Sequence, residues 1–331
     1  STIVFSISEM FLQDPYLMRI PVAGGDAERL PFGEGAGALS IAGSRGRLVY
    51  ERWQQKSDIW RMNGPTSEEG RPPIRLAASS TLAEHMPEYS PDGNKIAFAS
   101  NRLGNLEVWR SDMDGTKLQK LTNLGFSLPG GWSPDGSRIA FAASETGDEI
   151  WDIFLVDENG GLPQNLTQDE FSDACPSWSL DGRWIYYHSF RADGVQIFKI
   201  PTEGGPAVQV TEKGGLVPRL TEEGQLLYFR DGAIWSLPRD GGEETLILDK
   251  GLGWIFDWCT WQEYIVYYGQ DEEAGTTIEM FNRANGEVKV LHSLGKGTEV
   301  GFGLAVSPDG QSILYTQVES SADLMLVENF Y

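Results

Sequence analysis

A short turn sequence, Ser-Pro-Asp-Gly or a close variant, recurs along this chain, each time followed by a short apolar strand. Strong copies lie at residues 90–93, 133–136, 179–182 and 307–310, and weaker copies lie near Gly46, Gly224 and Glu263. From Gly46 to Gly310 there are 264 residues in six steps, a mean of 44. A period of roughly 40–45 residues, with four short strands in each unit, is typical of the blades of a β-propeller.

Each unit repeats the same order of four segments. The first ends in the Asp-Gly turn, where glycine supplies the positive φ of a tight hairpin. The second is apolar, as in Ile96-Ala-Phe98, and the third carries an apolar–aromatic pair such as Val108-Trp109. The fourth is polar and ends in Leu-Thr, as in Lys120-Leu-Thr122. Aromatic and β-branched inner strands suit sheets stacked face to face, and a polar last strand suits an exposed edge. We therefore predict an all-β fold, a β-propeller of four-stranded antiparallel blades.

The ends of the chain suggest how the ring closes. We predict one propeller domain over residues 1–331, in which residues 34–301 form six full blades. Residues 302–331 start a further blade but contain only three strand-like segments, and residues 1–33 contain three more without a first strand. The expectation is seven blades, with N- and C-terminal strands sharing a blade, so that 1–33 completes the one begun at 302–331. Eight blades, two of them short, and pairing of the incomplete blade with another chain are the alternatives.

Charge limits the kinds of partner. The formal net charge is −22, which repels phosphate backbones and anionic lipid surfaces, so we expect no nucleic-acid binding. The acidity serves solubility, or presents an acidic face to a basic or metal-bearing partner. No apolar stretch reaches 18 residues, so we expect no membrane insertion by this chain. Cys175 and Cys259 form no disulfide framework and are expected to be buried, inert thiols.

The run Trp/Tyr-Ser-Pro-Asp-Gly-x-x-Ile-Ala-Phe, the aromatic third strand and the closing Leu-Thr resemble the TolB-like, or WD-repeat-like, propeller repeat. The likeness covers nearly the whole chain. The tail from Leu304 to Phe330 is similar to the C-terminal end of large bacterial multi-repeat proteins with a signalling or scaffolding role. Because Ser1 is no start methionine and no signal peptide follows, we expect the natural protein to begin earlier. TolB itself binds a lipoprotein partner and short peptides, and related propellers gate a separate hydrolase domain. Neither role implies catalytic residues within the repeats.

Candidate ligand-binding residues come from the segments just before the first strands, which reach the mouth of the channel in a propeller. A ring of carboxylates there could bind a cation or a basic peptide end; the other interpretation is ordinary solvated loop residues. The candidates are Glu84, His85, Phe126, Asp173, Trp254, Phe256, Asp257 and Glu299.

Catalytic and cofactor signals are weak. His188 and His292 have no partners at metal-ligand spacing and are expected to be structural. The Ser-Pro-Asp-Gly runs are interpreted as hairpin chemistry. No catalytic residue is assigned and no cofactor is expected, with a channel-bound cation such as calcium left open.

The favoured function is therefore a non-catalytic binding or scaffolding propeller, recognising a protein, a peptide or a glycan at one ring face. It would belong to a larger bacterial sensory or envelope protein in the periplasm or otherwise outside the cytoplasm. One alternative is a propeller-fold polysaccharide lyase or hydrolase with its site at the channel mouth. The other is a domain that gates or docks a catalytic domain absent from this chain.

Overall fold

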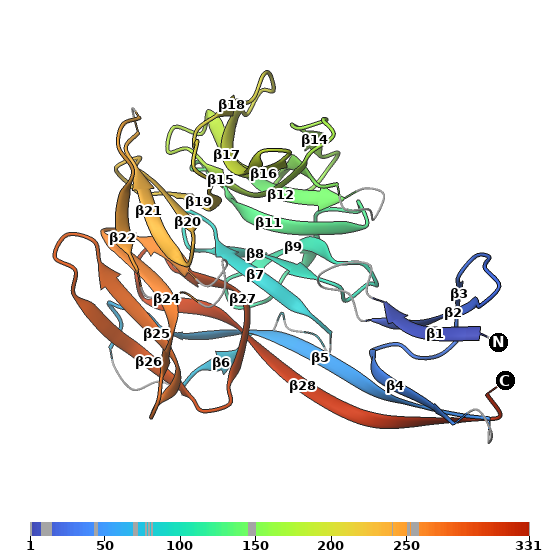
Figure 1. Cartoon of the computed structure of the whole chain (residues 1–331). Coiled ribbons are helices and arrows are strands. Elements are labelled where there is room, and N and C mark those ends of the chain that lie inside the picture. The colour runs from blue at the N-terminus through green and yellow to red at the C-terminus, as the bar shows by residue number, and fades with distance from the viewer. Residues whose placement is uncertain are drawn as a thin grey trace. The chain divides into compact units, whose positions relative to one another are not determined.

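The structure is a computed structural model that describes residues 2–7, 15–42, 46–68, 72–76, 78, 80, 82–144, 150–239, 241–249, 252 and 258–330. These residues form 28 β-strands, and none of them lies in an α-helix (Figure 1). The predicted all-β fold is thus confirmed. Among the described residues no helix is available to cross a membrane.

The chain divides into two compact units. One comprises residues 57–318, and the other comprises residues 1–56 together with 319–331. Two strands of 17 residues contribute to both units: β5 (Arg47–Asn63) and β28 (Ser312–Glu328).

The unit formed by residues 57–318 is the propeller. In its described part, five antiparallel sheets each use four strands that are consecutive in the chain. Their strands are β7 (Glu84–Tyr89), β8 (Lys95–Ser100), β9 (Glu107–Asp112) and β10 (Gln119–Lys120); β11 (Phe126–Trp132), β12 (Arg138–Ser144), β13 (Asp152–Asp157) and β14 (Gln164–Asn165); β15 (Ser172–Trp178), β16 (Trp184–Arg191), β17 (Gly194–Pro201) and β18 (Val208–Gln209); β19 (Leu216–Leu220), β20 (Leu226–Arg230), β21 (Ala233–Leu237) and β22 (Thr245–Leu248); and β23 (Trp258–Trp261), β24 (Tyr264–Asp271), β25 (Gly275–Asn282) and β26 (Val288–Gly295).

A sixth sheet closes the ring. It contains β27 (Glu299–Val306), residues 312–318 of β28, residues 57–63 of β5 and β6 (Ile74–Arg75). The first strands of the six sheets contact one another in a closed cycle: β7, β11, β15, β19, β23, β27 and β7 again. These six strands, the inner strands, therefore surround the axis of the propeller.

The closure of the ring differs from the prediction in the residues that complete the shared blade and in the number of blades. Strands from the two terminal parts of the chain do share one blade, but residues 57–63 of β5 and β6 complete it rather than residues 1–33. The prediction of seven blades is not confirmed, because six described sheets close the cycle. The reason lies in two segments, 51–58 and 316–322, where the repeat pattern requires a turn. Neither contains glycine or proline, and each continues as one extended strand.

The Ser-Pro-Asp-Gly runs form the turn between the first and second strands of a blade. The Ser90 hydroxyl donates to Asp92 Oδ1 at 2.6 Å, and the amides of Asn94 and Lys95 donate to Asp92 Oδ1 and Ser90 Oγ at 3.1 and 2.9 Å. The bond from Ser90 is the main reason that the pKa of Asp92 falls to about 2. The same bonds recur in the turns that begin at Ser133, Ser179 and Ser307. The interpretation of these runs as hairpin chemistry is confirmed.

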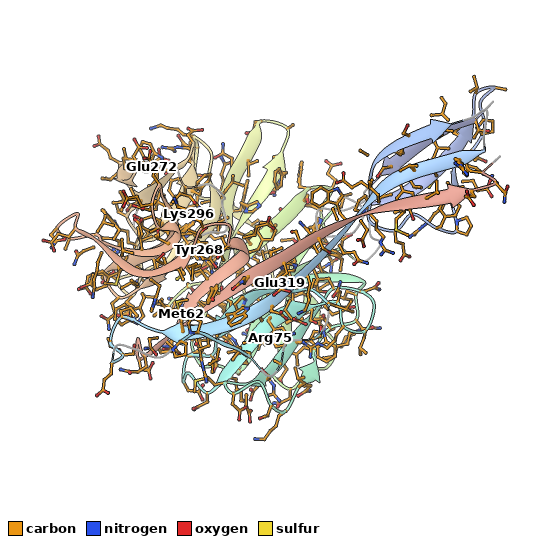
Figure 2. The ribbon with its side chains drawn as sticks, turned by 90° about the horizontal axis from the view of Figure 1, so that it is seen from below. Met62, Arg75, Tyr268, Glu272, Lys296 and Glu319 are labelled. Atoms are coloured by element: carbon orange, nitrogen blue, oxygen red, sulfur yellow. The ribbon has the colours of Figure 1, made fainter. Side chains whose placement is uncertain are left out.

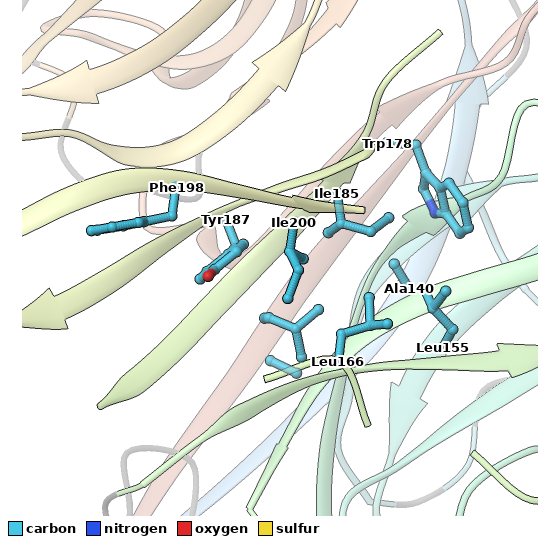
Figure 3. Packing of buried hydrophobic residues seen from close by; sticks show 10 residues of the cluster. Ala140, Leu155, Leu166, Trp178, Ile185, Tyr187, Phe198 and Ile200 are labelled. Atoms are coloured by element: carbon cyan, nitrogen blue, oxygen red, sulfur yellow. The ribbon is translucent and has the colours of Figure 1, made fainter. Parts of the chain in front are cut away.

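Blades pack through large apolar side chains, as the repeat pattern predicts. In the cluster shown in Figure 3, Trp178 and Tyr187 of one blade pack with Leu155 and Leu166 of the preceding blade. The tryptophan before the turn also bonds to the preceding blade: the Trp178 indole donates to the carbonyl of Gly131 at 3.1 Å. Trp132 does the same to the carbonyl of Glu88 at 3.3 Å.

The second unit has a small core of its own. Its strands are β1 (Thr2–Ile7), β2 (Tyr16–Pro21) and β3 (Glu28–Arg29), which form one sheet, and β4 (Ala36–Ala42), which pairs with residues 47–52 of β5. Leu17 and Leu48 are fully buried there, and Met325 and Val327 of β28 pack against the same cluster.

Candidate functional site

The inner strands are irregular at the same place in the repeat. Met86, Cys175 and Val217 have positive φ values of 52°, 55° and 49°, and each stands four residues before the serine or threonine that opens the turn. Positive φ in residues other than glycine costs on the order of 1–3 kcal/mol each, and such strain concentrates at functional sites. The register shifts lie between His85 and Glu88, Pro129 and Gly131, Ala174 and Ser177, Leu216 and Arg219, and Val300 and Leu304.

An ion pair joins two inner strands at the centre of the ring. Arg219 Nη1 of β19 lies 3.1 Å from Glu88 Oε1 of β7, and both side chains keep 22% of their exposure. β7 and β19 are three steps apart in the cycle of six, so they belong to opposite blades. Loss of hydration raises the pKa of Glu88, while the attraction of Arg219 opposes this rise. The centre therefore holds two opposite charges that are only partly hydrated.

The two cysteines flank this pair. Cys175 lies on β15 and Cys259 on β23, the strands on either side of β19 in the cycle. Burial raises the pKa of each thiol to about 12 although Arg219 opposes the shift. Both thiols therefore stay protonated at neutral pH and are poor nucleophiles. The expectation of a buried thiol is confirmed for Cys259, whereas Cys175 is partly exposed.

Glu84, the first residue of β7, is fully buried and paired. Its Oε1 accepts bonds from the Ser80 amide at 3.1 Å, the Ser100 hydroxyl at 3.2 Å and Arg102 Nη2 at 3.1 Å. Burial nevertheless raises the pKa of this carboxyl, against the opposing effect of those bonds. Glu84 thus acts inside the blade, and no part of its surface is exposed to a ligand.

His85 and Phe126 are also interior. The His85 ring lies 3.3 Å from the Ser57 hydroxyl, and its centroid is 6.1 Å from that of Phe302. Burial lowers the pKa of His85 to about 4, so the ring is neutral at pH 7. Phe126 packs edge-on against Trp151 with centroids 5.1 Å apart.

Asp173 is fully buried without a hydrogen-bond partner for either carboxylate oxygen. It holds the same place in its blade as Glu84, six residues before the serine of the turn. Arg191, the counterpart of Arg102, instead lies 3.3 Å from Asp169. Burial raises the pKa of Asp173 to about 7. The hydroxyl of Tyr187 in the same blade is likewise buried and unpartnered.

The remaining candidates are Glu299 and the segment 254–257. Glu299 begins β27 and is exposed. Trp254, Phe256 and Asp257 lie outside the described residues. In the part of the chain that the structure describes, no group of three or more His, Cys, Asp or Glu side chains is arranged to hold a metal ion. Glu84 and Asp173 therefore lie in separate blades and do not belong to one set of metal ligands.

Sequence reasoning missed the Glu88–Arg219 pair, although a signal was present. Both residues stand two positions before the residue that opens the turn, at Ser90 and Thr221. Opposite charges at one repeat position, three repeats apart, indicate a contact across an even-numbered ring of six. With seven blades expected, no blade faces another directly.

A second missed feature is a polar latch within the blades. The Thr122 hydroxyl accepts from the Val108 amide at 2.9 Å and donates to Glu107 Oε2 at 2.6 Å. Thr167 and Thr211 make the equivalent bonds, with Asp152 and Gln196 as acceptors. The threonine that ends these three units, in Leu121-Thr122, Leu166-Thr167 and Val210-Thr211, is therefore a structural element and not a ligand site.

Comparisons with known proteins agree with this architecture. Residues 125–234 match the family model described as the TolB β-propeller domain. An uncharacterised protein of Agrobacterium fabrum is 29% identical over 110 residues, which are 32% of this chain and 38% of that protein. A TolB homologue of Chlorobium luteolum is 30% identical over 112 residues, 34% of this chain and 25% of that protein. The matched segments are thus well under two thirds of either relative.

A solved structure described as TolB from Agrobacterium tumefaciens is similar in fold. It shares 22% identity with a TM-score of 0.62, over 80% of this chain and 99% of that one. At this level of identity, the similarity supports the fold and leaves the ligand open.

Proposed function

Because this chain is a TolB-like β-propeller protein, we propose that it is a non-catalytic binding module that recognises a protein or peptide at one face of the ring. The observation that carries the proposal is the Glu88–Arg219 pair between opposite blades. Partly hydrated charges at the centre of a ring of strained inner strands are suited to exchange partners with a charged ligand.

The charge of the protein favours a basic ligand. A net charge of −22 attracts cationic segments over distances near the Debye length, which is about 10 Å at 0.1 M salt. A lysine side chain or a free peptide amino terminus could then pair with Glu88 in place of Arg219. Arg219 would remain available to a carboxylate of the same ligand.

Two sets of unstructured ten-residue peptides test this proposal, one basic and one acidic, with free amino termini and equal apolar content. We expect calorimetric titration of the full chain to detect binding of basic peptides, weakening as salt increases. The double variant E88Q/R219Q, which leaves the net charge unchanged, should bind at least tenfold more weakly. Glu203→Gln, on an exposed turn, is the control and should keep the affinity within about twofold. Absence of binding by every basic peptide, or equal binding by the double variant, would refute the proposal.

The sequence-derived mouth residues take a supporting role in this proposal. Glu299 is exposed at the start of β27, whereas Glu84 and His85 would shape the face from within the blades. We place the protein outside the cytoplasm, as part of a larger bacterial envelope or sensory protein. Fractionation of cells that produce the complete natural protein would test that placement.

A further inference from the structure

The second half of β28 is an open sheet edge in the unit formed by residues 1–56 and 319–331. The pairing of β27 with β28 ends at Glu299 and Val318, and β5 is the neighbour of β28 on its other side. Residues 321–328 therefore have a strand on one side, while no strand that the structure describes lies on the other (Figure 2, which labels the nearby Glu319). An edge of this kind presents unpaired backbone N–H and C=O groups.

Side chains along this edge divide between the two faces of the strand. Met325 and Val327 pack against the core of the unit. Leu324 and Leu326 point to the other face and remain 81% and 54% exposed. A strand that adds to the edge could cover these two leucines with its own apolar side chains.

The usual protection of an edge is missing. Residues 312–328 contain no proline, glycine or lysine, the residues that commonly prevent an edge from pairing. Eight residues is also long for an unpaired edge, because whole strands usually have about five or six. These features favour pairing with another extended segment.

The charge of this edge indicates which kind of extended segment could pair with it. Glu319, Asp323 and Glu328 are the charged residues of this edge, and residues 312–331 include no basic residue. Asp323 and Glu328 lie 3.3 and 2.9 Å from Arg52 and Arg47 of β5. These two arginines therefore lie on the side of β28 that already pairs with β5, and not on its open side. Self-pairing of two such edges would bring acidic residues together, and two chains of charge −22 repel.

We propose that residues 321–328 bind an extended segment of a partner protein by strand addition, and that this segment alternates Lys or Arg with apolar residues. The backbone groups of the edge supply affinity. The alternation supplies specificity, with apolar side chains over Leu324 and Leu326 and cations beside Asp323 and Glu319. This proposal does not depend on ligand binding at the ring.

A labelled ten-residue peptide of alternating lysine and valine tests the proposal with the full chain. The control peptide has the same sequence with N-methyl groups on every second residue, which block hydrogen bonding along one edge. We expect the unmodified peptide to bind in fluorescence anisotropy and to slow amide exchange at residues 321–328. The N-methylated peptide should bind at least tenfold more weakly.

Variants locate the binding. L324S/L326S should reduce affinity at least tenfold, whereas Leu162→Ser, at a propeller residue that is 97% exposed, should leave it unchanged. In E88Q/R219Q the peptide should still slow amide exchange along this edge, which separates binding at the edge from binding at the ring. Equal binding of both peptides, or exchange at 321–328 that the peptide leaves unaltered, would overturn the proposal. A concentration-dependent dimer in sedimentation that L324S/L326S abolishes would instead identify a second copy as the occupant and would also overturn it.

Discussion

Glu88 and Arg219 form an ion pair between opposite blades of the propeller, with 3.1 Å between Oε1 and Nη1. They occupy the same position of the repeat, on inner strands three steps apart in a cycle of six. The pair thus connects two blades that are not adjacent and that have no adjacent blade in common. The free energy of this ion pair should therefore couple the stabilities of the two halves of the ring.

A double-mutant cycle measures this coupling. Removing one charge leaves its partner half-buried and unpaired, so E88Q and R219Q should each destabilise the chain by about 1–2 kcal/mol. The double variant should lose less than the sum, with an interaction free energy of about 1 kcal/mol. Urea unfolding followed by tryptophan fluorescence gives the three values. Effects that add to within about 0.3 kcal/mol would show that the pair contributes no coupling.

Asp173 predicts a pH dependence. Its pKa is about 7 in the folded protein and near the ordinary value of 3.8 when unfolded, so the folded state retains a proton between these pH values. Stability from this group is then fully present below pH 3.8 and is lost as pH rises to about 7. Asp173→Asn should therefore stabilise the protein by roughly 2 kcal/mol at pH 7.5, and by little at pH 4.

The matched control for Asp173 is Glu84→Gln. Glu84 has the same repeat position and its pKa is also raised by burial, but Glu84→Gln leaves Arg102 without its ion-pair partner, so this variant should gain less stability at pH 7.5 than Asp173→Asn does. Denaturant midpoints at pH 4, 6 and 7.5 distinguish the two variants. A gain from Asp173→Asn that stays constant over this range would contradict the ionisation argument.

The polar latch predicts a local loss of stability. Thr122→Val leaves the Val108 amide without its acceptor and removes one of the hydrogen bonds to the buried Glu107, which should cost about 1–3 kcal/mol. The Thr116 hydroxyl donates to Asp114 Oδ1 at 2.6 Å on an exposed turn, so Thr116→Val should cost under about 1 kcal/mol. Thermal unfolding compares the two. Equal losses would mean that the buried latch adds nothing beyond an ordinary turn.

The sequence predicts the blades well because each needs only local information. The Asp-Gly turn, the apolar second strand and the Leu-Thr ending all lie within one 44-residue unit. Closure of the ring depends on which distant strands pair, and here it depends on β5 and β28 continuing without a turn. The absence of glycine and proline between Tyr50 and Ile59 was the available signal.

The candidate site was predicted less well for a related reason. Glu84 and Asp173 were expected in loops at the channel mouth, yet each lies within an inner strand and is fully buried. Burial is a property of the packed fold that the sequence of one repeat does not encode. Alignment of the repeats does reveal Glu88 and Arg219, but only a count of six blades makes them opposite.

Gly303 tests the ring closure itself. It has φ of 112°, and a Cβ atom there would lie 2.6 Å from Met86 Cα and 2.7 Å from Pro87 Cδ of the adjoining inner strand. Gly303→Ala should therefore destabilise the protein by about 3 kcal/mol or more, because the clash adds to the backbone strain. Gly297 also has positive φ, at 77°, but its Cβ would meet no atom within 4 Å. Gly297→Ala should cost only about 1 kcal/mol, and equal midpoints in urea would show that β27 and β7 do not approach closely.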